Sequence, residues 1–461
     1  MRKIEDFEEM GMDTDDPAFK RYYKAGLLEE ADGKFLNHKV KSYWSPYLDD
    51  SVDTSIHAAF HSIAGYEEPK VVPQKVMWDI VMPFLNDMSM QPAYSDKNLY
   101  DILFQAERSP ETYVKRIDYK YYDGKNKPLT GDEAEKIISG LEEAIVKPSN
   151  RDNGSGIQKI KIVDEIIQVN GEAIEFNDLE HQLGSNFIVQ EVIQQHSVMS
   201  EPHPESVNTL RMVTLRWNNE IHYCLAFARF GTNGAVQDNA GTGGVCVGIT
   251  DEGDFVTQAV DEHANVMEKH PTTDFDFKQT LSRIPNFDTY IEFVKRLHER
   301  VLHHHFVSWD IAVGENGEPI FLEANFRGAT WLYQLASQKP VLGELTTEIF
   351  EEINRLKQAE EIDLLKVSPS AAASKKKIKG LRKRVQRLKK EAVQESLEKE
   401  ALVGENQRLG KRVKRQRRKM KRVRREADEQ LKWKENLVSS SYWKVTAPIR
   451  KVLLNNRGKE E

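Results

Sequence analysis

Cysteine is scarce in this 461-residue chain. The two cysteines, Cys224 and Cys246, are too few for a disulfide scaffold or a four-cysteine zinc site. The N-terminal stretch MRKIEDFEEMGMDTDDP is acidic and lacks an apolar run, so we do not expect a secretory signal. Runs of about 18 apolar residues, as needed to span a bilayer, are missing as well. These absences favour a reducing compartment, and we expect a cytoplasmic protein of bacterial type.

Negative charge is sparse in one part of the chain. The formal net charge is −7, but residues 371–461 contain 30 Lys and Arg against 11 Asp and Glu, a net charge of +19. The remaining 370 residues therefore carry −26. A hydrophobic content of 39% argues against disorder, and the acidic body is long enough for more than one core. The pattern predicts an acidic body with a basic tail.

Residues 1–93 are expected to form a helical N-terminal region. Phe60, Ile63 and Tyr66 are spaced three apart, and a second apolar set is spaced four apart, as on one face of a helix. That second set is Val76, Ile80 and Phe84.

Residues 94–354 have a different pattern, with short β-type runs separated by turns. The runs predict antiparallel pairs joined at WNNE and GENG, with helices at 131–143 and 287–303. We expect an α+β body with largely antiparallel sheets. The predicted strands are TYVKRIDYKYYD, AIVKPS, FIVQEVI, LRMVTLRW, EIHYCLAFARF, FVSWDIAV and PIFLEANF.

Lys147 stands at the end of a predicted strand, before a loop that contains Gly154, Ser155 and Gly156. Small residues let backbone N–H groups approach phosphate oxygens, and a lysine adds a positive charge. By itself this pattern is weak, since most such loops are plain turns.

Asp310, Glu323 and Asn325 form a second candidate site. Glu323 and Asn325 are two apart on one predicted strand and so face the same side, and the hairpin can bring Asp310 beside them. Three oxygen ligands of this kind suit Mg²⁺ held against a polyphosphate. An exposed polar hairpin is the alternative, but the surrounding residues are apolar, and a buried carboxylate needs a partner.

Together, and in this order, these segments resemble the ATP-grasp superfamily, and most closely its sugar-transfer-associated branch in cell-surface polysaccharide biosynthesis. The resemblance implies that two α+β subdomains hold ATP, with Mg²⁺ (or Mn²⁺), between them. It assigns Lys97, in AYSDKNLYDILF, and Lys147 to the nucleotide. The loop RDNGSGI is poorer in glycine than in many relatives, which weakens the phosphate assignment. The implied phosphate loop is Gly154, Ser155 and Gly156; the adenine hinge is Gln190, Glu191, Val192 and Ile193; the metal ligands are Asp310, Glu323 and Asn325.

The resemblance also implies a reaction: a carboxylate takes the γ-phosphate of ATP, and an amine or similar nucleophile then displaces phosphate. Arg211 and Arg229 are the candidates for holding the carboxylate, because a guanidinium fork suits carboxylate and phosphate. A structural ion pair is the alternative for each. Arg327, directly after the metal ligands, is a further candidate, and Asn239 is expected near the nucleotide unless its loop is a plain turn.

Residues 355–376 are predicted to be a linker, followed by a basic coiled coil at 377–436. Heptad core positions run from Leu381 to Ala427, and ten of these fourteen are apolar. A lone solvated basic helix is the alternative, although isolated helices are marginal.

The last segment, residues 437–461, is basic and aromatic. YWKVTAPIR at 442–450 resembles a segment that follows coiled coils in bacterial polysaccharide glycosyltransferases, which implies a glycosyltransferase partner. The basic run at 411–425 fits an anionic membrane surface or an acidic protein, and nucleic acid least, because aromatics do not interleave it. We therefore expect a cytoplasmic protein that could lie peripherally at the inner membrane face and self-associate through the coil.

The leading hypothesis is an ATP-dependent ligase that joins a carboxylate to an amine on a small molecule or glycan. The alternatives are a non-catalytic nucleotide-binding scaffold that organises glycosyltransferases, and a phosphotransferase that uses the same ATP site.

Overall fold

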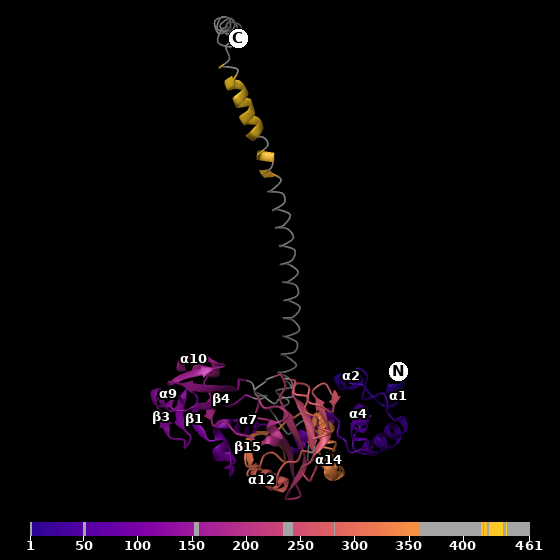
Figure 1. Cartoon of the computed structure of the whole chain (residues 1–461). Coiled ribbons are helices and arrows are strands. Elements are labelled where there is room, and N and C mark those ends of the chain that lie inside the picture. Colours follow the sequence, from indigo (N-terminus) through magenta and orange to yellow (C-terminus); the bar gives the residue numbers. More distant parts are fainter. Residues whose placement is uncertain are drawn as a thin grey trace. The chain divides into compact units, whose positions relative to one another are not determined.

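Figure 1 shows the computed structural model of the chain, which divides into two compact units, Met1–Ser368 and Pro369–Glu461. The structure describes residues 2–48, 52–151, 156–233, 243–280, 282–358, 416–417, 419–421, 424–436 and 439.

Short helices occupy the N-terminal region. Helix α2 begins at Pro17, where the missing N–H costs nothing, and the Asp16 side chain caps it by accepting from the backbone N–H of Ala18. Near residue 80 the predicted Val76, Ile80 and Phe84 are partly buried against the core. The fully buried apolar side chains there are Met77, Val81, Met82 and Leu85. The elements are α1 (Ile4–Glu9), α2 (Pro17–Lys24), the π-helix η1 (Phe35–Val40), α3 (Lys41–Trp44), α4 (Ser55–Ala64), α5 (Gln74–Val76), the π-helix η2 (Met77–Val81), α6 (Met82–Leu85), α7 (Gln91–Ser95), the 3₁₀-helix η3 (Lys97–Leu99) and α8 (Tyr100–Leu103).

The first sheet is antiparallel and has the strand order β3-β2-β1-β8-β4-β5-β6-β7 among the described residues. Helices α9 and α10 contribute Ile138 and Leu179 to its core. The elements are β1 (Thr112–Ile117), β2 (Lys120–Asp123), β3 (Pro128–Leu129), α9 (Gly131–Ser139), β4 (Glu143–Pro148), β5 (Gln158–Val163), β6 (Ile166–Val169), β7 (Glu172–Ala173), α10 (Phe176–Leu183) and β8 (Phe187–Gln190).

The second sheet is also antiparallel, with the described order β13-β12-β11-β10-β9-β14-β15. The elements are α11 (Ser197–Ser200), β9 (Thr209–Trp217), β10 (Glu220–Phe230), β11 (Val245–Ile249), β12 (Phe255–Asp261), β13 (Val266–Met267), α12 (Phe287–Glu299), β14 (Phe306–Val313), β15 (Pro319–Asn325), α13 (Thr330–Ser337), the 3₁₀-helix η5 (Gly343–Leu345) and α14 (Thr346–Gln358).

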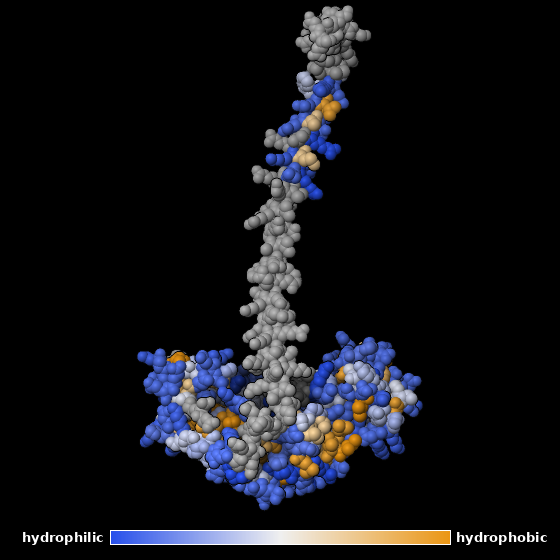
Figure 2. All heavy atoms as spheres, turned by 180° about the vertical axis from the view of Figure 1, so that it is seen from behind, coloured by the Kyte–Doolittle hydropathy of each residue, from blue (hydrophilic) through white to orange (hydrophobic). Residues whose placement is uncertain are grey.

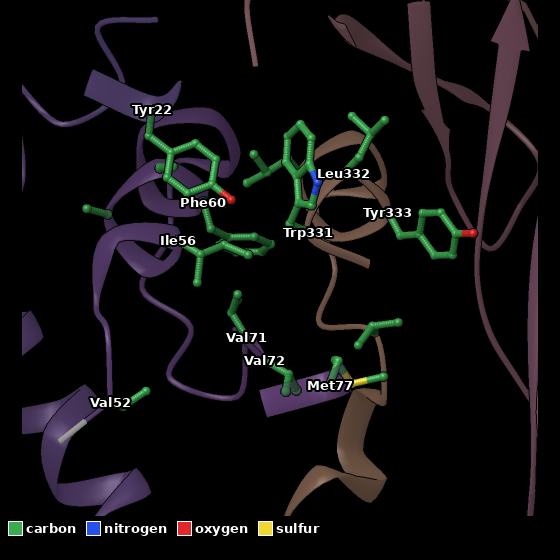
Figure 3. Packing of buried hydrophobic residues seen from close by; sticks show 14 of the residues in the cluster. Tyr22, Val52, Ile56, Phe60, Val71, Val72, Met77, Trp331, Leu332 and Tyr333 are labelled. Carbon is green, nitrogen blue, oxygen red and sulfur yellow. The ribbon is translucent and has the colours of Figure 1, made fainter. Parts of the chain in front are cut away.

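The two faces of the second sheet belong to different cores. Met212 and Trp309 pack with α12 on one face. Val213 and Phe227 pack on the other face with α13 and the N-terminal helices. In Figure 3, Trp331 of α13 points towards the N-terminal helices and Tyr333 towards the strands. Helix α13 therefore lies between the helical region and the sheet.

The α+β class with two largely antiparallel sheets is confirmed. Both predicted hairpins are present, and Asn218 and Asn219 have the positive φ angles, 50° and 64°, that a tight turn of this kind requires. Helix α14 continues through Gln358, into the segment that was predicted to be a linker.

The described part of the second unit is helical, at residues 416–417, 419–421 and 424–436. Figure 2 shows it as mostly hydrophilic, and its exposed apolar side chains are Met420, Leu431 and Trp433. Most heptad positions and the segment at 442–450 lie outside the described residues, so the coiled coil stays a prediction. Within the described part of the chain, none of the helices is long and apolar enough to cross a membrane.

Candidate active site

Strand register brings the predicted acidic residues and Arg211 together on one face of the second sheet. Asp310 of β14 lies directly opposite Glu323 of β15 and, on its other side, opposite Arg211 of β9. Directly opposed residues point to the same face of a sheet. Asn325, two residues beyond Glu323, shares that face. The register shifts next to Asp310, and such bulges redirect side chains beside functional sites.

Asp310 is the centre of a dense ion-pair network. Its carboxylate accepts from Nε and Nη2 of Arg211 at 2.6 and 2.8 Å and from Nη2 of Arg229 at 3.2 Å. Asn325 Nδ2 also donates to it, at 3.2 Å. Burial opposes ionisation of Asp310, but the two guanidinium groups outweigh burial and lower its pKa. The carboxylate is therefore charged at neutral pH. Both arginines do form ion pairs with Asp310, as the alternative for each had it.

Lys97, on η3, and Lys147, on β4 of the first sheet, both lie near Glu323. Lys97 is 5% exposed, and its Nζ donates to Glu323 Oε1 at 2.9 Å and to the carbonyl of Arg151 at 3.1 Å. Its backbone N–H donates to the Ser149 carbonyl, which ties η3 to the end of β4. Burial, together with the nearby Lys97 ammonium, lowers the pKa of Lys147 to about 8. The ammonium groups of Lys97 and Lys147 repel each other, and an anion bound between them would reduce this repulsion.

The predicted hinge residues follow β8. Gln190 donates to Thr112 Oγ1 at 3.1 Å, and Glu191 makes a two-fold ion pair with Arg108 at 2.7 and 2.9 Å. A hydrogen bond from Arg108, against partial burial, lowers the pKa of Glu191. The ion pair fixes the Glu191 side chain, so the chain beyond β8 is anchored. Apolar side chains from both sheets line the space beside it, namely Ile145, Val192, Ile193 and Leu322.

A cavity of about 750 Å³ brings most of the predicted site residues together. Gly156 is described, with φ +84°, and its neighbour Ile157 lines the cavity. Gly154, Ser155 and Asn239 lie outside the described residues. The predicted residues in the lining are Lys97, Lys147, Gln190, Glu191, Val192, Ile193, Arg211, Arg229, Asp310, Glu323, Asn325 and Arg327.

Other lining residues were not predicted from the sequence. Tyr333 accepts a hydrogen bond through its hydroxyl from Arg211 Nη1 at 2.8 Å and so helps to orient that arginine. Trp331 and Arg21 also line the cavity. Tyr333 and Trp331 lie on α13, which is buried on all sides and so lacks the spacing of an amphipathic helix. Arg21 gives no sequence signal, because it lies 310 residues before Trp331, the residue that it contacts.

Asp310, Glu323 and Asn325 fit a hard cation such as Mg²⁺ (or Mn²⁺), because all three offer oxygen and the Asn325 nitrogen is already used towards Asp310. Across the described residues, His, Cys, Asp and Glu side chains do not gather in a group of three or more that could hold a metal ion. A cation here would need phosphate oxygens to complete its coordination.

Residues 79–349 match the family described as sugar-transfer associated ATP-grasp. The chain belongs to this family. The ATP-grasp segment contains every predicted site residue, including those outside the described ranges, whereas Arg21 lies outside it. No curated protein has a sequence that matches the chain.

Several solved ATP-grasp ligases are similar to part of the chain at low identity. VanG D-Ala:D-Ser ligase from Enterococcus faecalis is 14% identical with a TM-score of 0.37; the match covers 59% of this chain and 64% of that one. D-alanine–D-alanine ligase from Bacillus anthracis is 12% identical with a TM-score of 0.34 and coverages of 63% and 78%. The ATP-grasp ligase PsnB, solved with a minimal precursor, Mg and ADP, is 11% identical with a TM-score of 0.34 and coverages of 59% and 62%. These likenesses concern the fold alone.

Proposed function

We propose that this chain is an ATP-dependent ligase that activates a carboxylate as an acylphosphate and joins it to an amine or similar nucleophile. One observation carries the proposal: Lys97, Lys147 and Arg211 line a single cavity together with Asp310 and Glu323. Among the described residues, seven Lys and Arg line this cavity against five Asp and Glu, although the body as a whole carries −26. A polyanion fits this local excess of positive charge.

ATP would lie with its adenine against the apolar side chains beside Ile193 and Leu322, where the backbone after β8 can bond the base edge. Its phosphates would meet Lys97, Lys147 and the loop of Gly154, Ser155 and Gly156. Asp310, Glu323 and Asn325 would hold Mg²⁺ (or Mn²⁺), which, when bound, neutralises phosphate charge. Asn239 is proposed to lie near the nucleotide as well.

The carboxylate substrate would lie beside Arg211 and Arg229, which line the cavity next to Asp310 and whose guanidinium forks suit a carboxylate. One carboxylate oxygen attacks the γ-phosphorus, and the bond from that phosphorus to the β-phosphate oxygen breaks, which releases ADP. The amine then attacks the acyl carbon, phosphate leaves with the bonding electrons, and the nitrogen loses a proton. The residues act mainly by positioning and charge stabilisation. Arg327 is proposed to stabilise the phosphate being transferred.

We also infer a role in the assembly of surface polysaccharide. Two features support this: the family is described as associated with sugar transfer, and residues 442–450 resemble a segment of polysaccharide glycosyltransferases. The basic tail would bind a glycosyltransferase, a second copy of the chain or an anionic membrane surface.

Turnover of ATP to ADP with Mg²⁺ and a panel of carboxylates and amines tests the proposed activity. Glu323→Ala removes a metal ligand and the partner of Lys97, so we expect at least a 100-fold loss of turnover, on the order seen when one strong electrostatic contact is removed. Glu315→Ala is the matched control, because Glu315 is exposed in the turn of the same hairpin. Wild-type turnover in Glu323→Ala would contradict the assigned site.

A further inference from the structure

The cavity extends beyond the segment that matches the family. Arg21, on α2 of the N-terminal region, lines the same cavity as Lys147 and Arg211, yet it lies outside residues 79–349. The wall at this end consists of α2 and the start of α13. Its chemistry is therefore particular to the N-terminal region of this chain.

Arg21 is held in a fixed place. Its guanidinium carbon lies 4.2 Å from the centre of the Trp331 ring, a cation–π contact. The next residue, Tyr22, packs edge-on against the same indole at 6.0 Å, and Trp331 is only 7% exposed. Figure 3 shows Tyr22 and Trp331 facing each other across the packed core. A guanidinium group that already packs on a buried indole ring loses little side-chain entropy when it binds a ligand.

Arg21 lies beside the Tyr22 hydroxyl, and its charge is not taken up by a direct ion pair among the described residues. In the described part of the chain, neither Arg21 nor Arg327 forms an ion pair with a carboxylate. The guanidinium carbon of Arg327 lies 6.0 Å from the centre of the Trp78 ring. In contrast, Arg211 pairs with Asp310, and Lys97 pairs with Glu323. A positive charge facing a cavity without an acidic partner is suited to an anionic ligand group.

That group would not be the triphosphate. Lys97 contacts Glu323 on β15, at one edge of the second sheet. Helix α13, which carries Trp331, contacts β10, β11 and β12 towards the other edge. Between them lie Arg211 and Asp310, and Tyr333 of α13 bonds Arg211. Arg21 is thus on the far side of the proposed reaction centre from the lysines.

We propose that Arg21 is a specificity residue that binds an anionic group, a carboxylate or a phosphate, on the second, amine-bearing substrate. This inference rests on the proposed function. It limits the amine substrates to molecules that carry their own negative charge, such as amino acids or amino-sugar phosphates, and it makes the N-terminal region part of the substrate site.

Calorimetric titration of the full-length protein, saturated with Mg²⁺ and a non-hydrolysable ATP analogue, tests this inference. The probes are two pairs: glucosamine 6-phosphate against glucosamine, and L-alanine against L-alaninamide. We expect the anionic member of one pair to bind at least about tenfold more tightly, since a hydrogen-bonded ion contact contributes about 1.5–3 kcal/mol. A preference within the glucosamine pair identifies phosphate as the anionic group that Arg21 binds, and a preference within the alanine pair identifies carboxylate.

Arg21→Met keeps the aliphatic stem over Trp331 and should abolish the preference, whereas Arg21→Lys should retain part of it. Lys24→Ala, an exposed position on the same helix, should behave as wild type. Equal binding of both members of each pair to the wild type, or an unchanged preference in a folded Arg21→Met variant, overturns the inference. The analogue itself should bind all variants equally. If the ATP analogue binds neither the wild type nor any variant, the proposed function fails. Titrations of the probes in the absence of the analogue still test the role of Arg21.

Discussion

At the residue scale, the cavity keeps two ammonium groups close together. Lys97 has Glu323 as a partner, whereas burial and Lys97 lower the pKa of Lys147 to about 8. An entering phosphate would relieve this repulsion and favour the charged form of Lys147. Part of the nucleotide affinity should therefore depend on the protonation of this one side chain.

Nucleotide affinity should fall as the pH rises above 8. Below that pH Lys147 is already protonated in the free protein; above it, binding must bring a proton from solution. We expect the Kd for an ATP analogue to rise by about tenfold between pH 8 and 9.5. Lys147→Met should bind at least about tenfold more weakly at pH 7 and lose this slope, while Lys161→Met, exposed on β5, should keep it. Calorimetry at several pH values would show this, and an unchanged slope in Lys147→Met would contradict the assignment.

Asp310 should matter for stability as well as for activity. Asp310→Asn leaves two buried guanidinium groups without their shared carboxylate, and arginine cannot escape by losing its proton. We expect a loss of about 3–5 kcal/mol in the free energy of unfolding. Glu323→Gln should cost less, because Lys97 keeps the carbonyl of Arg151 as a hydrogen-bond partner. Urea denaturation of the wild type and of both variants measures these costs. If Asp310→Asn is as stable as the wild type, the network around Asp310 contributes little to stability.

At the scale of elements, helix α13 connects the N-terminal helices to the reaction face. It lies so close to β11 that a Cβ at Gly248 would be 2.3 Å from the carbonyl oxygen of Ala336. Only a glycine permits this approach without movement of the backbone. The position of Tyr333, and with it the orientation of Arg211, therefore depends on this contact.

Gly248→Ala should destabilise the protein and disturb the site together. We expect a loss of about 1–3 kcal/mol from overpacking, with a larger proportional fall in turnover than in nucleotide affinity, since α13 touches Arg211 rather than the lysines. Gly131→Ala, at the first turn of α9 where a Cβ meets nothing within 4 Å, is the control and should be neutral or slightly stabilising. Thermal unfolding and turnover of both variants give the comparison; wild-type values for Gly248→Ala would refute the close-packing argument.

The sequence predicted those elements whose local pattern was strong. Alternating apolar residues around Asn218 and Asn219 indicated the β9–β10 hairpin, and the same reasoning placed Asp310 opposite Glu323. Strand β11 and helix α13 were missed, because both are buried on all sides and so lack the alternation or spacing of an amphipathic element. The predicted apolar face near residue 80 does pack against the core, but the most deeply buried side chains there are Met77 and Val81, since the π-helix Met77–Val81 breaks the spacing of a regular α-helix.

The site was predictable where its residues share a hairpin and unpredictable where tertiary packing assembles it. Glu323 and Asn325 follow from strand periodicity alone. Arg21 and Tyr333 depend on where α2 and α13 pack, and Arg108 became visible only as the ion-pair partner of Glu191. Such long-range contacts have no signature in one sequence.

At the scale of the whole molecule, charge divides the chain. The described site residues all belong to the compact unit Met1–Ser368, whereas the basic residues of 371–461 belong to the second unit. The −26 body concentrates positive charge in its cavity, and the +19 tail is available for other partners.

Removal of residues 369–461 should separate these roles. We expect nucleotide turnover to stay within about twofold of the full-length value, because a compact domain keeps its own core. Binding to vesicles that contain anionic lipid should be lost, and in the full-length protein it should weaken with added salt. Sedimentation with anionic and neutral vesicles measures this. If the truncated protein still binds anionic vesicles as the full-length chain does, the tail is not the membrane-binding segment.

Trapping of the activated carboxylate tests the central claim most directly. The protein is incubated with Mg²⁺, ATP and a panel of carboxylates, without an amine, and quenched with hydroxylamine, which converts an acylphosphate to a stable hydroxamate. We predict that one class of carboxylate gives a hydroxamate in step with ADP, and that Glu323→Ala gives none above background. Binding of ATP without ADP or hydroxamate from any carboxylate would contradict the ligase and favour a nucleotide-binding scaffold.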